Sequence, residues 1–519
     1  MGTSKKEMRH WRWATWALWL VAAVILFGHA RDYGMSWDEI TRWQSGDHKL
    51  TYYKNLFSEG LTVWGSAQGN DKYPGLYDLP LALYSDWTGG DRLLAGRYWN
   101  IFWGILALVG TSLLACRFSG WRGGFFAALF LVLLPRFYGH IPINPKDIPF
   151  AATYLFGVLA ALWLYAKLPG AKWHHWAAVG LAAGFAMATR VPGMIVLAYL
   201  WMLAGTDVLR SWNRAADQKK PWRRLLAPLS GCALSTLIAY FVLVIFFPSA
   251  HVNPFKDSVR VVSQLHEFSS EIPLLFRGTV ISSGDAPWYY LPWMMLVTTP
   301  LVHVLIGALG LLTFAGHLRD ASKTKSLLSH EFVARALVVW AFLFPIAYIM
   351  VTQPAVHNGI RHALFVLPLA AVIGSWGCED LFARLSGLRA RRIACVLALG
   401  YVTYLGALLI RAHPYQYIYY NMLVGGTKSV MGQYETEYWY TSTQEAVSLL
   451  EDWLKKRNRA EEPIKIAATG PKQVTEYYLP EGWQWVDSPR HANFFIGNTQ
   501  FAGHLLGKGP VILEIRRLG

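Results

Sequence analysis

Two adjacent acids, Asp38 and Glu39, stand shortly after the first long apolar run of the chain, directly behind Ser36 and Trp37. A carboxylate beside a membrane surface can deprotonate an acceptor hydroxyl as a general base, and there it can meet both a lipid-borne and a soluble molecule. The alternative is local, because Ser36 or Asp38 followed by an acid in a first helical turn is an ordinary N-cap. We predict that Asp38 is the base and keep the N-cap as the alternative.

A second group of polar residues lies in a proline-rich turn between two apolar runs and contains His140, Asn144, Lys146 and Asp147. Ionisable groups at the depth of a membrane are costly and tend to mark function. Lys146 can hold a phosphate as a point charge. Asp147 can orient Lys146, bind an acceptor or share a divalent cation with Asp38. The alternative is a turn whose charges face water.

A third group, His357-Asn358-Gly359-Ile360-Arg361-His362, precedes another apolar run. An arginine beside the bilayer surface is a good clamp for a lipid phosphate. The positive end of the helix that follows it would strengthen such a site. The alternative is an arginine that snorkels to the interface. Arg190, between two short apolar runs, is a weaker candidate for the same role.

A membrane is needed to position these three groups. The chain has 519 residues, of which 54% are hydrophobic and 15% are charged, whereas soluble domains carry about 25% charged residues. Apolar runs of roughly 17–25 residues, the length that crosses a bilayer, recur along the chain. The sequence therefore predicts an all-α, polytopic membrane bundle.

About eleven runs are predicted to span the membrane. They cover residues 14–30, 98–116, 124–138, 148–166, 176–188, 191–204, 225–247, 293–315, 332–351, 363–382 and 393–410. The fifth and sixth runs are short, and a re-entrant hairpin is the alternative for this pair. Neither choice changes the side on which any later loop lies.

Lysine and arginine are concentrated in alternate loops, which orients a membrane protein with these loops in the cytoplasm. The net charge of +16 comes largely from these loops and does not indicate a nucleic-acid partner. With a cytoplasmic N-terminus, loops 31–97 and 248–292 and everything after Arg411 lie outside the cytoplasm. The three polar groups then share this outer face.

The composition changes after the last apolar run, where prolines separate shorter segments. Residues 443–457 have the apolar stripe of a surface helix, and residues 464–468, 494–497 and 511–515 have the pattern of strands. We predict two domains. Residues 1–411 form the membrane module with its outer loops, and residues 412–519 form a small extracytoplasmic α/β domain.

Common nucleotide-binding and zinc-peptidase motifs are absent from the sequence. A phosphate-binding glycine loop, for example, does not occur. The energy for any reaction must therefore arrive in a substrate that is already activated.

In these features the chain resembles the GT-C superfamily of membrane glycosyltransferases, which use polyprenyl-phosphate sugars. Within it, the bacterial protein O-mannosyltransferases and the aminoarabinose lipid A transferases are the most similar. The resemblance lies in Trp37-Asp38-Glu39, Lys72-Tyr73-Pro74, Asn144-Pro145-Lys146-Asp147-Ile148-Pro149, Arg361-His362, Tyr415–Gly426 and Tyr434–Trp439. It covers the chain from the N-terminus to about residue 440.

The resemblance implies that Asp38 is the catalytic acid of the first loop, that Glu39 supports it, and that Asp147 is the acid of the second loop. Contacts to the lipid phosphate are expected at Lys72, Arg361 and His140. The full set of expected substrate-binding residues is Lys72, His140, Asn144, Lys146, Arg190, Arg361 and His362. A divalent metal cation shared by Asp38 and Asp147 is an open alternative.

The activity implied is an inverting transfer of a sugar from a polyprenyl-phosphate donor to an acceptor protein, lipid or glycan. It would take place on the outer face of the bacterial inner membrane, among membrane lipids. One base and a good leaving group suffice for inversion, whereas retention would need a nucleophilic carboxylate near the anomeric carbon. The alternatives are a transporter or flippase of lipid-linked sugars and a degenerate, non-catalytic transferase subunit.

Overall fold

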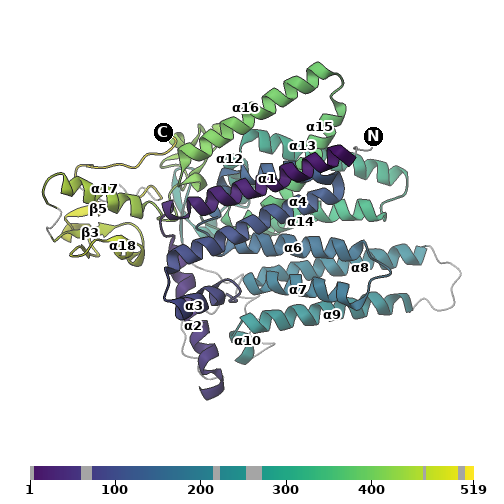
Figure 1. The fold of residues 1–519 in the computed structure, drawn as a ribbon, viewed down its shortest axis with the longest axis horizontal. Coiled ribbons are helices and arrows are strands. Elements are labelled where there is room, and N and C mark those ends of the chain that lie inside the picture. The colour runs from purple at the N-terminus through teal and green to yellow at the C-terminus, as the bar shows by residue number, and fades with distance from the viewer. Residues whose placement is uncertain (1–4, 60–72, 214–222, 253–271, 460–462, 501–508) are drawn as a thin grey trace.

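The structure is a computed structural model that describes residues 5–59, 73–213, 223–252, 272–459, 463–500 and 509–519. Long apolar helices dominate it and lie side by side as a bundle (Figure 1). They are α1 (Lys5–Gly28), α4 (Arg92–Val132), α6 (Asp147–Tyr165), α7 (Trp173–Thr189), α8 (Ile195–Asn213), α9 (Arg223–Phe246), α13 (Leu301–Lys323), α14 (His330–Thr352), α15 (Leu367–Arg384) and α16 (Leu388–Ala412).

Nine helices among the described residues are long and apolar enough to cross a membrane. One of them, α4, has 41 residues and merges two helices across a kink at Gly120, where φ is 62°. Since 41 residues are about twice the number needed for one crossing, α4 holds two of the predicted spans. Helix α7 has 17 residues and is only slightly shorter than the others. With α4 taken twice and α7 added, the structure agrees with the prediction of about eleven spans.

Two predicted spans have wrong boundaries, and proline explains both. The run 293–315 is divided into α12 (Tyr290–Thr298) and α13, because Pro300 cannot continue a helix and holds Thr299 extended, with ψ of 134°. The run 124–138 ends early at Val132, and a separate short helix, α5 (Pro135–His140), begins with a proline. Proline supplies no backbone N–H but fits a first helical turn.

Helix α8 is longer than the run 191–204 predicted. Together with the preceding turn η3 (Val191–Met194), it makes an apolar helical stretch from Val191 to Trp212. Helices α7 and α8 both pack against α6 and α9. These two short runs are therefore helices of the bundle and do not form a re-entrant hairpin.

The shorter elements gather at one end of the bundle. They are α2 (Trp37–Glu59), α3 (Asp78–Thr88), α10 (Ser249–Val252) and the antiparallel hairpin of β1 (Pro273–Phe276) and β2 (Thr279–Ser282). The short 3-10 helices of this part are η1 (Ala30–Asp32), η4 (Ser283–Asp285), η5 (Arg361–Val366), η6 (Gln416–Ile418), η7 (Met422–Val424) and η8 (Thr427–Val430), whereas η9 (Pro489–His491) belongs to the C-terminal part described next. Helices α2 and α3 lie at the end where α1 finishes and α6 begins (Figure 1).

The C-terminal part forms a small α/β unit beyond the same end of the bundle (Figure 1). Its elements are α17 (Thr443–Lys455), β3 (Lys465–Ala468), α18 (Lys472–Tyr478), β4 (Gln484–Trp485) and β5 (Phe494–Ile496). The strands are parallel in the order β4-β3-β5, and α17 supplies Val447, Leu450 and Leu454 to a core with Ile466 and Trp483. The predicted helix at 443–457 and the strands at 464–468 and 494–497 are confirmed, whereas residues 511–515 form no strand.

Candidate active site

The first loop is fixed at the start of α2 by hydrogen bonds that involve Ser36. Its Oγ donates to the carbonyl of Ile143 at 2.7 Å, which joins the first loop to the second. Its backbone N–H donates to the Glu39 carboxylate at 2.7 Å, which is half of a capping box. Glu39 also lies 3.6 Å from Arg97, and burial raises its pKa in spite of that arginine. Ser36 and Glu39 therefore form the N-cap that was the alternative, and the Asp38 carboxylate takes no part in it.

Asp38 is fully buried between two cations. Its Oδ1 lies 2.9 Å from Lys146 Nζ and its Oδ2 lies 2.5 Å from Arg361 Nη2. Burial alone would raise the pKa of this carboxyl, but the positive charges of Arg361 and Lys146 outweigh burial and lower the pKa to about 2. Asp38 is thus an ionised, strongly paired carboxylate at neutral pH.

Asp147 lies on the other side of Arg361. The Nε of Arg361 is 3.3 Å from Asp147 Oδ2, and Arg190 pairs with Asp147 Oδ1. Asn144 donates to Asp147 Oδ2 at 2.9 Å. One guanidinium group therefore joins the acid of the first loop to the acid of the second, although the two acids are far apart in the sequence.

Asn144 organises the second loop. Its Oδ1 accepts hydrogen bonds from the backbone N–H groups of Lys146 at 3.2 Å and Asp147 at 2.9 Å, an Asx-type turn that starts α6. Its Nδ2 donates to Nδ1 of His140 at 2.9 Å. His140 is buried behind Asn144, with its Nε2 3.1 Å from the Tyr438 hydroxyl, and burial lowers its pKa to about 3. His140 is therefore a neutral group that supports Asn144.

A tight turn presents Arg361. Asn358 and Gly359 both have left-handed backbones, with φ of 58° and 66°. Their N–H groups donate to the Glu435 carboxylate and to the Tyr290 hydroxyl, each at 3.0 Å. The turn leads into η5 and then α15, so Arg361 stands at the start of a helical segment.

Aromatic rings line the other side of Arg361. Its guanidinium carbon lies 4.6 Å from the centre of the Trp439 ring. His362 lies beside the turn, and its ring centre is 4.9 Å from that of His357. Burial lowers the pKa of His357 to about 3, so this ring adds no positive charge at neutral pH.

Two further residues of this site were not predicted as site residues, namely Arg42 and Tyr73, although Tyr73 lies in the motif Lys72-Tyr73-Pro74. The Tyr73 ring centre lies 4.9 Å from Lys146 Nζ and 4.5 Å from the Arg42 guanidinium carbon. Burial would raise the pKa of Tyr73, but Lys146, Arg190 and Arg42 together lower it. Lys72, which was predicted to contact substrate, lies outside the described residues.

The signal that could have identified Arg42 is its helical spacing from Asp38. Residues four and seven apart share one face of a helix, and Asp38, Arg42, Ser45 and Lys49 follow this spacing in α2. Arg42, Ser45 and Lys49 all contact Asp78 at the start of α3. The polar stripe along α2 was thus readable, although its partner Asp78 was not.

The charges of the central group do not cancel. Lys146, Arg190 and Arg361 carry three positive charges, and Asp38 and Asp147 carry two negative charges, which leaves one positive charge on these five residues. A buried charge is costly unless it is paired. The arrangement therefore favours a bound anion, and the N-terminus of α6 points positive backbone dipoles at the same place.

A metal shared by Asp38 and Asp147 remains a prediction that this arrangement does not support. The Asp38 oxygens contact Lys146 and Arg361, and those of Asp147 contact Arg361, Arg190 and Asn144. A divalent cation would have to displace cationic groups from both acids. Carboxylates that serve as Mg²⁺ or Ca²⁺ ligands face the metal and water instead.

No protein-family model and no curated protein matches the sequence. Among solved structures, ArnT from Cupriavidus metallidurans bound to undecaprenyl phosphate is similar, with a TM-score of 0.50, 14% identity, and coverage of 90% of this chain and 85% of that chain. The apo form of ArnT gives 0.49 at 14% identity, covering 93% and 86%. The oligosaccharyltransferase AglB from Archaeoglobus fulgidus, in complex with an inhibitory peptide and a dolichol-phosphate, gives 0.46 at 11% identity, covering 87% and 62%. The chain therefore has the same overall fold as ArnT, which is the GT-C fold that the resemblance implied.

Proposed function

We propose that the protein transfers a sugar from a polyprenyl-phosphate donor to an acceptor at the membrane surface, with Asp38 as the general base. The observation that carries this proposal is the position of Arg361, which contacts Asp38 and Asp147 at once. A group that binds phosphate and a group that accepts a proton are thereby neighbours. The GT-C fold supports the same reaction class, since ArnT was solved with undecaprenyl phosphate.

The donor phosphate would bind where the positive charge is in excess. A sugar linked to a polyprenyl phosphate is a phosphodiester with one negative charge, which matches the single excess charge of the central group. Lys146, Arg190 and Arg361 are placed to share its oxygens, and arginine forks suit phosphate geometry. The phosphate would compete with Asp38 for Lys146 and Arg361.

This competition gives Asp38 its basicity. A carboxylate with a pKa of about 2 is a weak base, and a general base works best with a pKa nearer the working pH. Once the phosphate neutralises Lys146 and Arg361, the burial of Asp38 remains and raises its pKa. Binding of the donor phosphate would therefore make Asp38 a stronger base.

In the transfer step the acceptor hydroxyl loses its proton to Asp38 while its oxygen forms a bond to the anomeric carbon. The bond from that carbon to the phosphate oxygen breaks, and the polyprenyl phosphate leaves with the electron pair. Its second negative charge develops beside Lys146, Arg190 and Arg361, which stabilise it. Attack and departure on opposite faces give inversion.

Asp147 would act on the position of these groups. It contacts Arg190, Arg361 and Asn144, and therefore holds two guanidinium groups in register with the turn that carries Lys146. We assign it a positioning role. A transporter is a weaker candidate, since transporters bind near the middle of the membrane, whereas this charged cluster lies at helix starts, at one end of the bundle.

We further propose that this end faces the outside of a bacterial inner membrane. Arg117, Lys167, Lys172 and Arg319 lie in or beside the loops assigned to the opposite face, and cationic loops stay in the cytoplasm. The domains would then be a catalytic membrane module and an extracytoplasmic α/β domain. The sugar and the acceptor, whether protein, lipid or glycan, follow from the experiment below.

The experiment is Asp38→Asn in the full chain, expressed in a strain that lacks the gene. Mass spectrometry of lipid-linked sugars and envelope glycans should show that the unchanged chain restores a glycan and that the variant does not. Binding of undecaprenyl phosphate to the purified variant should persist, because Lys146, Arg190 and Arg361 remain. Asp86→Asn, at an exposed acid of α3, is the matched control. Restoration of the glycan by Asp38→Asn would refute the assigned base.

A further inference from the structure

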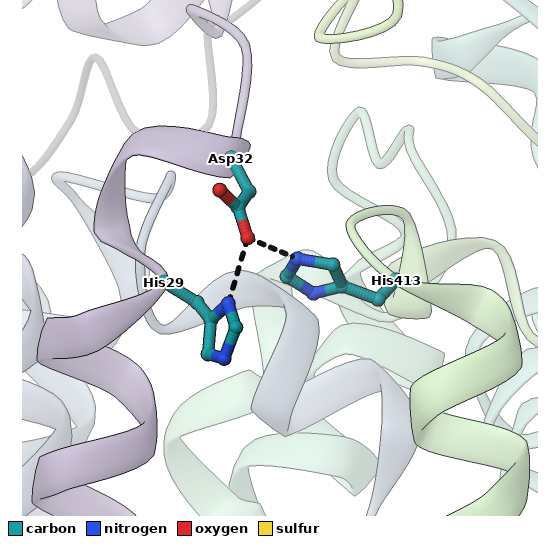
Figure 2. A group of neighbouring side chains, drawn as sticks. All are labelled: His29, Asp32 and His413. Atoms are coloured by element: carbon teal, nitrogen blue, oxygen red, sulfur yellow. Dashed lines mark hydrogen bonds and ion pairs between the residues drawn. The ribbon is translucent and has the colours of Figure 1, made fainter.

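A second cluster of titratable side chains lies apart from the central group, where the first and last long helices end. His29 follows α1, Asp32 ends η1, and His413 follows α16. Figure 2 shows both imidazole rings directed at one carboxylate oxygen of Asp32. His29 Nδ1 and His413 Nε2 each lie 2.8 Å from that oxygen. Each of the three residues offers one possible ligand atom, and these three atoms lie within 4.8 Å of one another.

Local structure holds the three residues in this arrangement. The Asp32 N–H donates to the His29 carbonyl at 3.1 Å, which places the two side chains on one turn. The His413 N–H donates to the Ile410 carbonyl at 3.2 Å, so His413 continues the end of α16. The rings of His29 and His413 meet edge to face, with centres 5.4 Å apart.

The donor set is that of a first-row divalent metal. Two imidazoles and one carboxylate are common ligands of Zn²⁺, and a fourth position is then open to water. The side chains of His29, Asp32 and His413 are 59%, 45% and 27% exposed, so water and metal can reach them. Tetrahedral Zn²⁺ with bonds of about 2.0–2.1 Å separates its ligands by about 3.3 Å, which the exposed side chains reach by a small rotation.

We propose that His29, Asp32 and His413 bind a divalent transition-metal ion, Zn²⁺ by their ligand set, which fastens the end of α1 to the end of α16. The residue after Asp32 is Tyr33, whose buried ring lies 5.2 Å from that of His413. Ser36 and Asp38 follow it. The metal would thus anchor the segment that leads to the candidate base without touching that base, and the proposal is independent of the transferase function.

The test uses the full chain without a polyhistidine tag, stripped with EDTA and held in lipid nanodiscs. Titration with Co²⁺, which absorbs visible light when it is tetrahedral, should saturate at one ion per chain, and Zn²⁺ should displace it. His29→Gln, Asp32→Asn and His413→Gln should each weaken Co²⁺ binding at least tenfold, because a lost second-shell contact already costs about 10–100-fold. His491→Gln, at an exposed histidine of η9, should bind Co²⁺ like the unchanged chain.

Zn²⁺ should also raise the melting temperature of the unchanged chain, because a ligand that binds only the folded state stabilises it. The three ligand variants should lose this rise while their melting temperature without metal shows that they fold. The proposal is overturned if Co²⁺ at micromolar concentrations fails to bind, which would leave a hydrogen-bonded triad. It is equally overturned if binding is the same in the variants as in the unchanged chain.

Discussion

Two groups of buried carboxyls lie close together in this protein, and their partners differ. Asp38 and Asp147 are paired with lysine and arginine, and the cations lower the pKa of Asp38 to about 2. Glu435 and Glu437 accept hydrogen bonds from backbone N–H groups and from uncharged side chains instead. Burial raises the pKa of Glu435 to about 8.

The difference separates the proposed phosphate-binding group, Asp38 and Asp147 with their cations, from the structure that supports it, which we call the frame and which contains Glu435 and Glu437. Paired charges can exchange partners with an anion, so the first group suits a phosphate. The uncharged donors around Glu435 and Glu437 cannot form ion pairs with an anion. These two glutamates instead fix the backbone at Asn358 and Tyr440. The acidic and aromatic stretch 434–439 therefore serves to pack the C-terminal segment on the bundle and to shape the turn before Arg361.

After the loss of transfer expected for Asp38→Asn, the largest effect is expected from Arg361→Gln. This change removes a cation that touches both acids and leaves Asp38 and Asp147 without the charge between them. We expect transfer to fall about 10²–10³-fold, the loss typical of one preorganised donor at a developing negative charge. Undecaprenyl phosphate binding to the purified chain should weaken in parallel. Arg411→Gln, an exposed arginine at the same end of the bundle, is the control, and equal binding by both variants would contradict the phosphate role.

Gly359→Ala tests whether the turn at Asn358 and Gly359 sets the position of Arg361. Gly359 has φ of 66°, and an added Cβ would lie 3.2 Å from Arg136 Nη1. A left-handed backbone costs a residue with a side chain about 1–2 kcal/mol, so we expect a lower melting temperature and weaker undecaprenyl phosphate binding together. Gly425→Ala, at a glycine that is also left-handed but forms the C-cap of η7, should lower the melting temperature without changing the binding. Unchanged binding in Gly359→Ala would mean that the turn does not set Arg361.

Glu435→Gln tests the titration of the frame. The folded pKa of about 8 exceeds the ordinary value of 4.5, so between these values the folded chain holds a proton that the unfolded chain has lost. Stability should therefore be greatest below pH 4.5 and fall as the pH rises toward 8, by up to about 1.4 kcal/mol per pH unit. Denaturation of the unchanged chain and of Glu435→Gln at pH 5 and pH 8 measures this, and the variant should lose most of the difference. The same pH dependence in both would assign it to another group.

Much of the bundle was predictable because it depends on local sequence. Apolar runs and cationic loops act within one helix and its ends, and the described helices follow them closely. The breaks at Pro135 and Pro300 were also local signals, although their consequence for the span boundaries was missed. Residues 511–515 have the composition of a strand, but β5 and β4 are the neighbours that pair with β3, and strand formation depends on such a partner.

The site was predictable to the extent that its residues are unusual in a membrane. Asp38, Asp147 and Arg361 stand out as charges beside apolar runs, and the structure brings them together. Tyr73 does not stand out, since an aromatic residue in a turn is ordinary, and the helical spacing of Arg42 from Asp38 does not by itself reveal what Arg42 contacts. Their role depends on how α2 crosses the second loop, which a single sequence does not reveal. The same holds for Arg97, which pairs with Glu39.

The smallest effect is expected from Trp439→Phe. Trp439 belongs to the stretch 434–439 that also holds Glu435 and Glu437, and its ring contacts Arg361 of the other group. The Trp439 ring lies against Arg361, and among the described residues its buried Nε1 has no hydrogen-bond partner. Phenylalanine therefore removes ring area and part of the cation–π attraction, which is worth about 0.5–1 kcal/mol. Undecaprenyl phosphate binding should weaken about two- to fivefold, the equivalent of that energy. Trp453→Phe, in α17, removes the same kind of contact from Arg457, which follows that helix and lies 3.7 Å from the Trp453 ring centre. Because α17 lies outside the bundle (Figure 1), this control should leave binding unchanged, and an equal loss in both variants would show that Trp439 acts through general stability and not through Arg361.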